Sequence, residues 1–242
     1  MSDSLVIIPT YNELENIERI IRKVFSLEKH FDILIIEDNS PDGTAAIVHK
    51  LIEKFPNRLY IEERKGKLGL GTAYIHGFKW ALKHEYGYIF EMDADFSHNP
   101  EDLEKLYDAC AHKGADVAIG SRYIKGVNVV NWPMGRVLMS YVASMYVRFI
   151  TRMPIMDATA GFKCYTRRVL EAIPFEKIKF VGYAFQIEMK YTAWRMGFKI
   201  AEVPIIFTDR TAGVSKMSSH IFKEAVLGVL RLRLKNVKRV VN

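Results

Sequence analysis

The segment 88–95 ends a short apolar run in two carboxylates one residue apart, Asp93 and Asp95. In an extended chain, residues i and i+2 project to the same side, so both side chains are expected to enter one small volume at the end of a strand. Two neighbouring carboxylates repel each other, which favours a cation between them. Such a pair suits a hard divalent ion, Mg2+ or Mn2+, that is shared with a phosphate ligand. A solvated loop is the alternative for an isolated triplet of this kind.

Two other polar segments follow apolar runs in the same way. Residues 9–13 follow the run 5–8, and an ordinary turn with a helix cap is one interpretation of them. The other places Tyr11 and Glu13 at the rim of a nucleotide pocket. Asp38 follows the run 33–36 and is either part of a solvated turn or a hydrogen-bond acceptor for a base or ribose.

The glycine-rich segment 66–71 invites comparison with phosphate-binding loops, but its spacing does not fit them. It lacks the G-x-x-x-x-G-K-[ST] pattern and the third glycine of the dinucleotide fingerprint. We interpret it as a tight turn before a helix.

The elements that must position these residues alternate along the chain. Short β-branched runs predict buried strands, and apolar residues at helical spacing predict helices between them. This alternation predicts an α/β fold with a mostly parallel sheet covered on both faces, in which ligands bind at the carboxyl ends of the strands. The predicted strands are 5–8, 33–36, 59–62, 88–92 and 116–119, and the predicted helices are 16–25, 45–54, 70–84 and 101–112.

The composition fits one large domain. The chain has 242 residues, of which 49% are apolar, and its formal charge of +7 favours an anionic partner. Its two cysteines, Cys110 and Cys164, are too few for a disulfide framework, which favours reduced thiols inside a cell. The first four residues show no basic region or cleavage site, so we expect no secretory leader.

The positive charge is concentrated in two zones, 117–156 and 225–242, which contain no acidic residue. In the first zone Arg136, Ser140, Ser144, Arg148 and Arg152 recur every four residues, a polar stripe on an otherwise apolar helix. Core packing is one explanation, and a helix lying at a membrane interface is the other. The longest apolar stretch, 137–147, is shorter than the about 20 residues that span a bilayer. We expect residues 1–217 to form the main domain and 218–242 a basic amphipathic helix.

The polar motifs occur as an ordered set, and the set resembles the family 2 glycosyltransferases, most closely the dolichol-phosphate (polyprenol-phosphate) mannose synthases. The resemblance covers roughly residues 4–218 and implies the GT-A fold of nucleotide-diphospho-sugar transferases, a three-layer sandwich with a mostly parallel mixed sheet. The motifs are PTYNE at 9–13, EDNSPDGT at 37–44, KLGLGTAY at 67–74, DADFSH at 93–98, GSRY at 120–123, DATAGFK at 157–163 and RTAGVSK at 210–216.

The resemblance implies roles for individual residues. The nucleotide-sugar set comprises Pro9, Tyr11, Glu13, Ile36, Asp38, Asp93, Ala94, Asp95, Arg122, Arg210 and Lys216. Within it, Asp95 is the main ligand of a Mg2+ or Mn2+ ion, and Ser97 can complete the coordination shell of that ion. Arg210 and Lys216 close over the donor pyrophosphate. Arg122, Arg136 and Ser140 resemble the residues that meet the acceptor phosphate. Asp93, Asp95, Arg122 and Lys216 are the expected catalytic residues. Glu37 departs from the family, which often has a second aspartate there.

The chemistry agrees with these roles. Sugar transfer from a nucleoside diphosphate needs the leaving-group charge neutralised, which a divalent ion with Arg210 and Lys216 supplies. A lipid phosphate, with a second pKa near 6 by analogy with other phosphomonoesters, is largely dianionic at neutral pH and needs no general base. It needs a cationic cradle, which Arg122 and Arg136 provide. We therefore assign no catalytic histidine.

The sequence thus predicts inverting, metal-dependent transfer of mannose from GDP-mannose to a dolichyl or polyprenyl phosphate. The expected location is peripheral, at the cytoplasmic face of a membrane, reached directly or through a membrane-anchoring subunit. A related transferase that uses UDP-glucose or another nucleotide sugar is the alternative. A non-catalytic nucleotide-sugar sensor is disfavoured because both halves of the site are present, and nucleic-acid binding because the basic zones lack a stacking platform.

Overall fold

The computed structural model describes residues 2–182, 184–209, 228–235 and 237–241. Helices and strands alternate from the N-terminus, as the sequence predicts, and most predicted bounds agree within two residues. The strands are β1 (Ser4–Thr10), β2 (Asp32–Glu37), β3 (Leu59–Glu63), β4 (Tyr88–Glu91), β5 (Val117–Ser121), β6 (Val129–Val130), β7 (Lys163–Thr166), β8 (Ile200–Pro204) and β9 (Phe207–Thr208). The helices are α1 (Ile17–Phe25), α2 (Thr44–Lys54), α3 (Leu70–Leu82), α4 (Asp102–Ala111), α5 (Met134–Thr151), α6 (Arg167–Ala172) and α7 (Ala184–Arg195), with a 3-10 turn at Phe175–Lys177.

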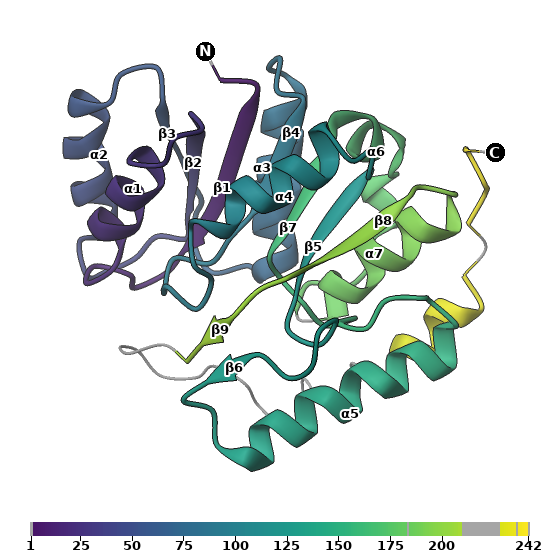
Figure 1. The fold of residues 1–242 in the computed structure, drawn as a ribbon. Helices are drawn as coiled ribbons and strands as arrows, with labels where there is room; N and C mark the ends of the chain where they lie inside the picture. Colours follow the sequence, from purple (N-terminus) through teal and green to yellow (C-terminus); the bar gives the residue numbers. More distant parts are fainter. Residues whose placement is uncertain (1, 183, 210–227, 236, 242) are drawn as a thin grey trace.

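The main sheet has the strand order β3-β2-β1-β4-β7-β5-β8 (Figure 1). All neighbouring strands are parallel except β7, which runs antiparallel to both β4 and β5. The order reverses between β1 and β4, and ligands of open α/β sheets bind at such switch points. The polar segments after β1 and β4 therefore lie where a ligand is expected.

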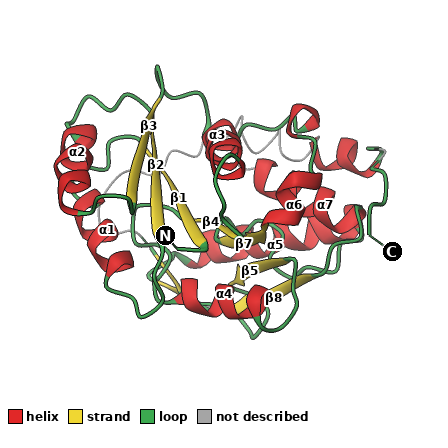
Figure 2. Cartoon of the chain, turned by 90° about the horizontal axis from the view of Figure 1, so that it is seen from above, coloured by secondary structure: helices red, strands yellow, loops and turns green. Residues whose placement is uncertain are grey.

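Alternating strand residues feed two separate cores, which makes the three layers seen in Figure 2. Leu5 and Ile7 of β1 face the core formed with α3, α6 and α7. Val6 and Ile8 face the core formed with α1, α2 and α4. Because the strands are buried on both faces, they read as continuous apolar runs in the sequence. The predicted mostly parallel mixed sheet in a three-layer sandwich is confirmed.

β1 continues through Pro9, where the sequence prediction ended it. The β1–β4 register stops at the pair Ile7–Glu91, whereas Pro9 still pairs with Ile36 of β2. Proline lacks a backbone N–H, and it is tolerated here because the hydrogen-bond ladder between β1 and β4 has already ended.

α5 differs from the other helices because it crosses below the carboxyl ends of the strands and does not flank the sheet (Figure 1). Only Ser144, Val147 and Thr151 of its side chains are buried. The small parallel pair β6–β9 lies beside its N-terminal end. Within the ranges that the structure describes, no helix is both long and apolar enough to cross a bilayer.

The tail is helical at 228–233 and then leaves the helical path, so the single helix predicted for 218–242 differs from what the described part shows. The backbone amides of Val240 and Val241 donate to the carbonyl of Met196, and Lys235 pairs with Glu188 at 2.6 Å. The tail is thereby attached to α7. The predicted boundary at 217/218 lies outside the described residues.

Candidate functional site

The loops after β1 and β2 are fastened to each other by short polar side chains. The backbone amides of Asn12, Glu13 and Leu14 donate to side chains of the second loop. Their acceptors are Ser40 Oγ at 3.0 Å, Thr44 Oγ1 at 3.1 Å and Asp42 Oδ2 at 3.1 Å. These hydrogen bonds between the two loops hold Tyr11 and Glu13 at the carboxyl edge of the sheet, where the sequence predicts them.

Asp38 is held by a residue that sequence reasoning did not select. Its two carboxylate oxygens accept from Arg64 Nε at 2.6 Å and Nη2 at 2.7 Å, and both side chains are less than 10% exposed. The third donor of Arg64, Nη1, reaches Thr72 Oγ1 at 2.8 Å. Arg64 therefore links the end of β2 to the start of α3, and a base bound at Asp38 would meet this arginine as well.

Two further residues qualify the predicted nucleotide set. Ile36 is fully buried in the core, so its side chain does not line the edge of the sheet. Lys67 Nζ lies 5.0 Å from the ring centre of Tyr11, which places the exposed glycine-rich loop beside the predicted nucleotide rim. Gly69 in that loop has a φ of +99°, and a Cβ there would lie 3.0 Å from the carbonyl oxygen of Val181. The predicted tight turn before a helix is confirmed.

Asp93 and Asp95 occupy a bend, because β4 ends at Glu91 and Phe96 has a φ of +58°. The aspartates thus follow the end of a strand, as the sequence predicts, but they lie in irregular chain and not in an extended continuation of β4. Ser97 donates to Asp95 Oδ1 through its backbone amide at 3.0 Å and through its hydroxyl. Tyr74 donates to Asp93 Oδ1 at 3.4 Å, and Ala94 between the two aspartates is buried. The bend thus carries short oxygen-bearing side chains directly after the end of β4, with Asp95 held by Ser97 and Asp93 by Tyr74.

His98 follows this bend and is stacked on Phe162. Its Nδ1 is 4.0 Å from Asp93 Oδ2. Burial lowers the pKa of His98 to about 4, against the raising effect of Asp95, so the imidazole is neutral at neutral pH. His98 thus adds no positive charge beside the aspartates.

A buried polar cluster of Glu91, Lys163 and Gln186 lies at the end of β4, directly before the bend. The register of β4 and β7 places Lys163 opposite Glu91, and Lys163 Nζ lies 2.9 Å from Glu91 Oε2. Gln186 of α7 donates to the same oxygen at 2.7 Å. Burial lowers the pKa of Lys163, although the charge of Glu91 opposes this. The antiparallel β7 therefore supplies the lysine that pairs with the buried carboxylate of Glu91 at the end of β4.

Asp93, Asp95 and Ser97 offer oxygen atoms only, the donor type that Mg2+ and Mn2+ prefer. Within the described part of the chain, no three His, Cys, Asp or Glu side chains form a complete metal cage. Ions that are held by one or two carboxylates and by ligand phosphates need no such cage. The residues present fit a metal that arrives with a diphosphate.

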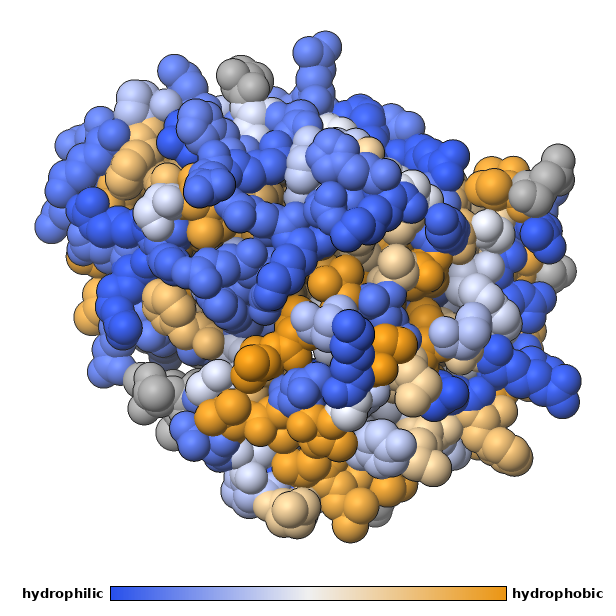
Figure 3. All heavy atoms as spheres, in the orientation of Figure 1, coloured by the Kyte–Doolittle hydropathy of each residue, from blue (hydrophilic) through white to orange (hydrophobic). Residues whose placement is uncertain are grey.

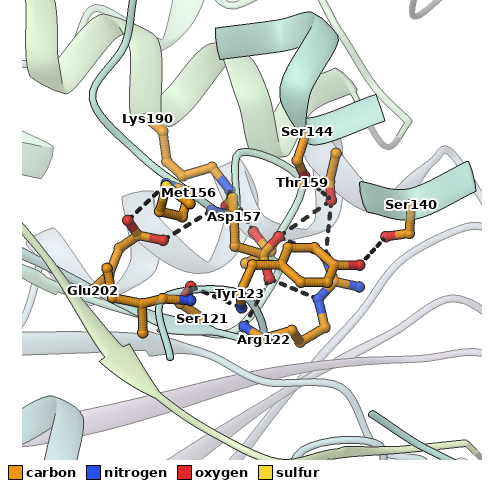
Figure 4. A network of polar contacts seen from close by, with 12 residues as sticks. Ser121, Arg122, Tyr123, Ser140, Ser144, Met156, Asp157, Thr159, Lys190 and Glu202 are labelled. Atoms are coloured by element: carbon orange, nitrogen blue, oxygen red, sulfur yellow. Dashed lines mark hydrogen bonds and ion pairs between the residues drawn. The ribbon is translucent and has the colours of Figure 1, made fainter. Parts of the chain in front are cut away.

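On the other side of the site, Arg122 is fixed by Asp157 (Figure 4). Asp157 accepts from the backbone amide of Arg122 at 3.0 Å, from its Nε at 2.7 Å and from its Nη2 at 2.6 Å. Burial works against the charge of Asp157, but the hydrogen bonds and charge of Arg122 hold the pKa of that carboxyl below its usual range. Asp157 raises the pKa of Arg122, against the effect of burial. The pair is therefore ionised.

The loop that carries Asp157 is itself held at both ends. Glu202 of β8 accepts from the backbone amides of Met156 and Asp157 at 2.7 and 2.9 Å. The fully buried Lys190 of α7 donates to the carbonyl of Ala160 at 2.7 Å. The contacts in Figure 4 thus run from the sheet and α7 to Arg122.

Arg136 and Arg122 meet at one aromatic ring. The guanidinium carbon of Arg136 is 4.3 Å and that of Arg122 5.5 Å from the ring centre of Trp132. The Trp132 Nε1 is buried and has no hydrogen-bond partner within the part of the chain that the structure describes. Arg136 also pairs with Asp209 at 2.9 Å, and Ser140 accepts a 2.8 Å hydrogen bond from the Tyr123 hydroxyl. The structure therefore brings the three predicted acceptor residues together.

Of the predicted site residues, Arg210 and Lys216 lie outside the described residues. Sequence reasoning did not select Arg64, Trp132 or Lys190. Trp132 carried one detectable signal, since it is a tryptophan four residues before Arg136 in an acid-free zone. Arg64 and Lys190 carried none, because each acts through a partner at least 26 residues away in the chain.

Comparison with known proteins agrees with this geometry. The model of glycosyl transferase family 2 matches residues 5–174. The chain is 46% identical to the polyprenol monophosphomannose synthase of Mycolicibacterium smegmatis, over 98% of this chain and 91% of that protein. It is 41% identical to the undecaprenyl-phosphate mannosyltransferase of Micrococcus luteus, over 94% of this chain and 92% of that protein.

Among solved structures, a mannosyltransferase from Pyrobaculum calidifontis in complex with GDP-Man and Mn2+ aligns with a TM-score of 0.58 at 18% identity. The alignment covers 96% of this chain and 62% of that one, and at this identity it supports the GT-A fold alone. The family match and the relatives, which align over nearly the whole chain, decide the assignment. The chain belongs to glycosyl transferase family 2.

Proposed function

We propose that this enzyme transfers mannose from GDP-mannose to a polyprenyl phosphate, with inversion at the sugar carbon, giving polyprenyl-phosphate mannose and GDP. Two relatives whose names specify mannose and a polyprenyl acceptor align with nearly the whole chain. The observation that carries the proposal is the convergence of Arg122 and Arg136 on Trp132. Two guanidinium groups at one apolar ring suit a phosphate that is attached to a lipid.

We assign the binding site for the sugar donor to the loops after β1 and β2 and to the bend after β4. Tyr11, Glu13 and Asp38 would contact the nucleoside, together with Pro9 and the backbone around Ile36. Asp93, Asp95 and Ser97 would hold Mg2+ or Mn2+, which neutralises the charge that develops on the diphosphate. Arg210 and Lys216 remain assigned to the pyrophosphate. Catalytic residues in this assignment are Asp93, Asp95, Arg122 and Lys216.

The reaction is a single displacement. An oxygen of the acceptor phosphate attacks the anomeric carbon of mannose, and the bond from that carbon to the diphosphate oxygen breaks, so that GDP leaves with the bonding electron pair. The attacking oxygen carries negative charge and has no proton to lose. This chain's part is to bring two anions together. Arg122 and Arg136 supply positive charge for the acceptor. Ser140 and the indole N–H of Trp132, which has no partner among the described residues, supply donors.

The acceptor's lipid places the enzyme at a membrane surface. Along α5, Met134, Leu138, Val142, Met145 and Phe149 are 49–82% exposed. Figure 3 shows hydrophobic atoms gathered in the lower part of the molecule, where α5 lies in Figure 1. The same helix turns Arg136 and Ser140 toward the site. We propose that the apolar face lies on the bilayer and that residues 1–217 form the transferase domain to which the tail is attached.

The decisive test incubates the enzyme with polyprenyl phosphate, Mn2+ and labelled GDP-mannose, in parallel with UDP-glucose. We expect a mannosyl lipid product with GDP-mannose and none with UDP-glucose. If only UDP-glucose gives product, the alternative donor is correct. Nucleotide binding without turnover under any of these conditions would instead identify a sensor.

Arg64 offers a separate prediction about the donor side. Changing Arg64 to glutamine removes both hydrogen bonds to Asp38 and leaves that carboxylate buried without its cation. A hydrogen bond to a charged group is worth about 1.5–3 kcal/mol, and if misplacing Asp38 costs GDP one such bond, GDP affinity should fall about 10- to 100-fold. Isothermal titration with GDP measures this. Arg22→Gln, which breaks an exposed pair with Glu18, is the control and should bind GDP normally.

A further inference from the structure

Three arginines line a groove of about 680 Å³ at the C-terminal end of α5. Arg148 belongs to the last turn of α5, and Arg152 follows the helix. Arg233 comes from the helical segment 228–233, which lies beside this end of α5 in Figure 1. The groove therefore joins the two acid-free zones of the sequence.

The charges of these three arginines are not balanced by acidic side chains of the described residues. Among the residues that the structure describes, Arg148, Arg152 and Arg233 form no ion pair or side-chain hydrogen bond. By contrast, Arg122 and Arg136 are both paired with aspartates. Three guanidinium groups around one groove repel each other, and an anion between them would relieve that repulsion.

The groove is too far from the acceptor site to serve the same phosphate. Arg136 and Arg148 are separated by 12 residues of one straight helix, which corresponds to about 18 Å at 1.5 Å per residue. A phosphate group that contacts Arg136 cannot reach this distance. An anion bound in this groove would therefore be a second one, distinct from the acceptor phosphate.

The remaining lining shows what kind of anion fits. Phe149 and Leu234 are 82% and 85% exposed, and the partly exposed Leu230 also lines the groove. A soluble anion would leave these apolar side chains in water. An amphiphile with a phosphate at one end and hydrocarbon at the other satisfies both parts of the groove.

We propose that this groove binds the headgroup of an anionic phospholipid, with Phe149 and Leu234 entering the hydrocarbon region. The inference depends on the membrane association in the proposed function and adds a lipid that is neither donor nor acceptor. The bound headgroup fixes the C-terminal end of α5 at the bilayer. The helix then lies with Leu138, Val142 and Met145 toward the membrane and Arg136 toward the acceptor phosphate.

The test is flotation of the full-length protein with vesicles of phosphatidylcholine alone or of equal parts phosphatidylcholine and phosphatidylglycerol, without donor or acceptor. The variant R148Q/R152Q/R233Q is compared with K50Q/K54Q/K83Q, which loses the same charge from α2 and the end of α3. Each arginine near an anionic surface should contribute about fivefold. We expect the arginine variant to bind phosphatidylglycerol vesicles about 100-fold more weakly, and the lysine variant to bind them nearly as wild type does.

A second variant, F149S/L234S, tests the apolar part and should also lose vesicle binding while its melting temperature stays unchanged. Millimolar glycerol phosphate should not displace the wild type from vesicles. Equal loss in both triple variants, displacement by glycerol phosphate, or equal wild-type binding to both vesicle types would each overturn the proposal. Mannose transfer to detergent-dispersed acceptor is measured separately, so failure of the proposed function is distinguishable from failure of this one.

Discussion

Replacing Asp95 with asparagine is expected to lower mannose transfer about 1,000-fold or more while the fold stays intact. The substitution keeps the side-chain shape, so the backbone amide of Ser97 still finds an oxygen acceptor. It removes the charge that would hold a divalent ion against the donor diphosphate. Loss of such charge stabilisation is worth several kcal/mol in the transition state, and each 1.4 kcal/mol is about a factor of ten in rate.

Two measurements separate this effect from misfolding. The melting temperature of the Asp95→Asn variant should match the wild type, because Asp95 is partly exposed and outside the core. Manganese should strengthen GDP binding to the wild type and not to the variant. Asp108→Asn, which breaks an exposed pair with Lys113, should behave as wild type in both assays. A fully active Asp95→Asn enzyme would remove this residue from the metal site.

Local pattern was sufficient for most of the first 120 residues. The strands are apolar runs and the helices show helical spacing, so their bounds follow from short windows of sequence. β7 was missed because Lys163–Thr166 contains a lysine and a cysteine in a short mixed run. Its lysine makes sense only beside Glu91, 72 residues earlier in the chain. Strand pairing over such distances leaves no periodic signal.

The polar stripe of α5 shows how a correct pattern can be interpreted too simply. Residues four apart on a helix with 3.6 residues per turn advance by about 40° at each step. Arg136, Ser140 and Ser144 therefore face the site, with Ser144 buried, whereas Arg148 has turned about 120° from Arg136 and lines the outer groove. One stripe in the sequence thus serves two places in the structure.

The site residues divide in a similar way. The aspartates after β4 and Arg122 were recognisable as candidates because they belong to short motifs, and Arg136 because it belongs to the polar stripe of an acid-free zone. The contacts that hold the site residues were not recognisable. Arg64 is outside the motifs, Asp157 is in one without any sign of its role, and their partners Asp38 and Arg122 are 26 and 35 residues away. Motifs predict which groups meet a ligand, and the fold decides what holds those groups in place.

Asp157→Asn is expected to destabilise the protein by about 3–5 kcal/mol, because it leaves the buried Arg122 without its counter-charge. The neighbouring Lys190 donates to the backbone carbonyl of Asp157 at 3.5 Å, and burial lowers the pKa of this lysine well below its usual value. Arg122 would turn away from its position at Trp132, so acceptor KM should rise while GDP affinity stays near the wild-type value. Urea unfolding and transfer kinetics measure the two effects, and Glu171→Gln, which breaks an exposed pair with Arg167, is the control.

The pH dependence has a definite sign. The pKa of Asp157 is lower in the folded protein than its usual 3.8, so its contribution to stability is fully present above about pH 4 and is lost as the pH falls through the lowered value. The stability difference between wild type and Asp157→Asn should therefore be constant from pH 7 to pH 5 and shrink only in stronger acid. A double-mutant cycle combines Asp157→Asn with Arg122→Gln. The double variant should lose less free energy of unfolding than the two single variants lose together, because it no longer buries an unpaired charge. Additive losses would show that Asp157 does not hold Arg122 through charge.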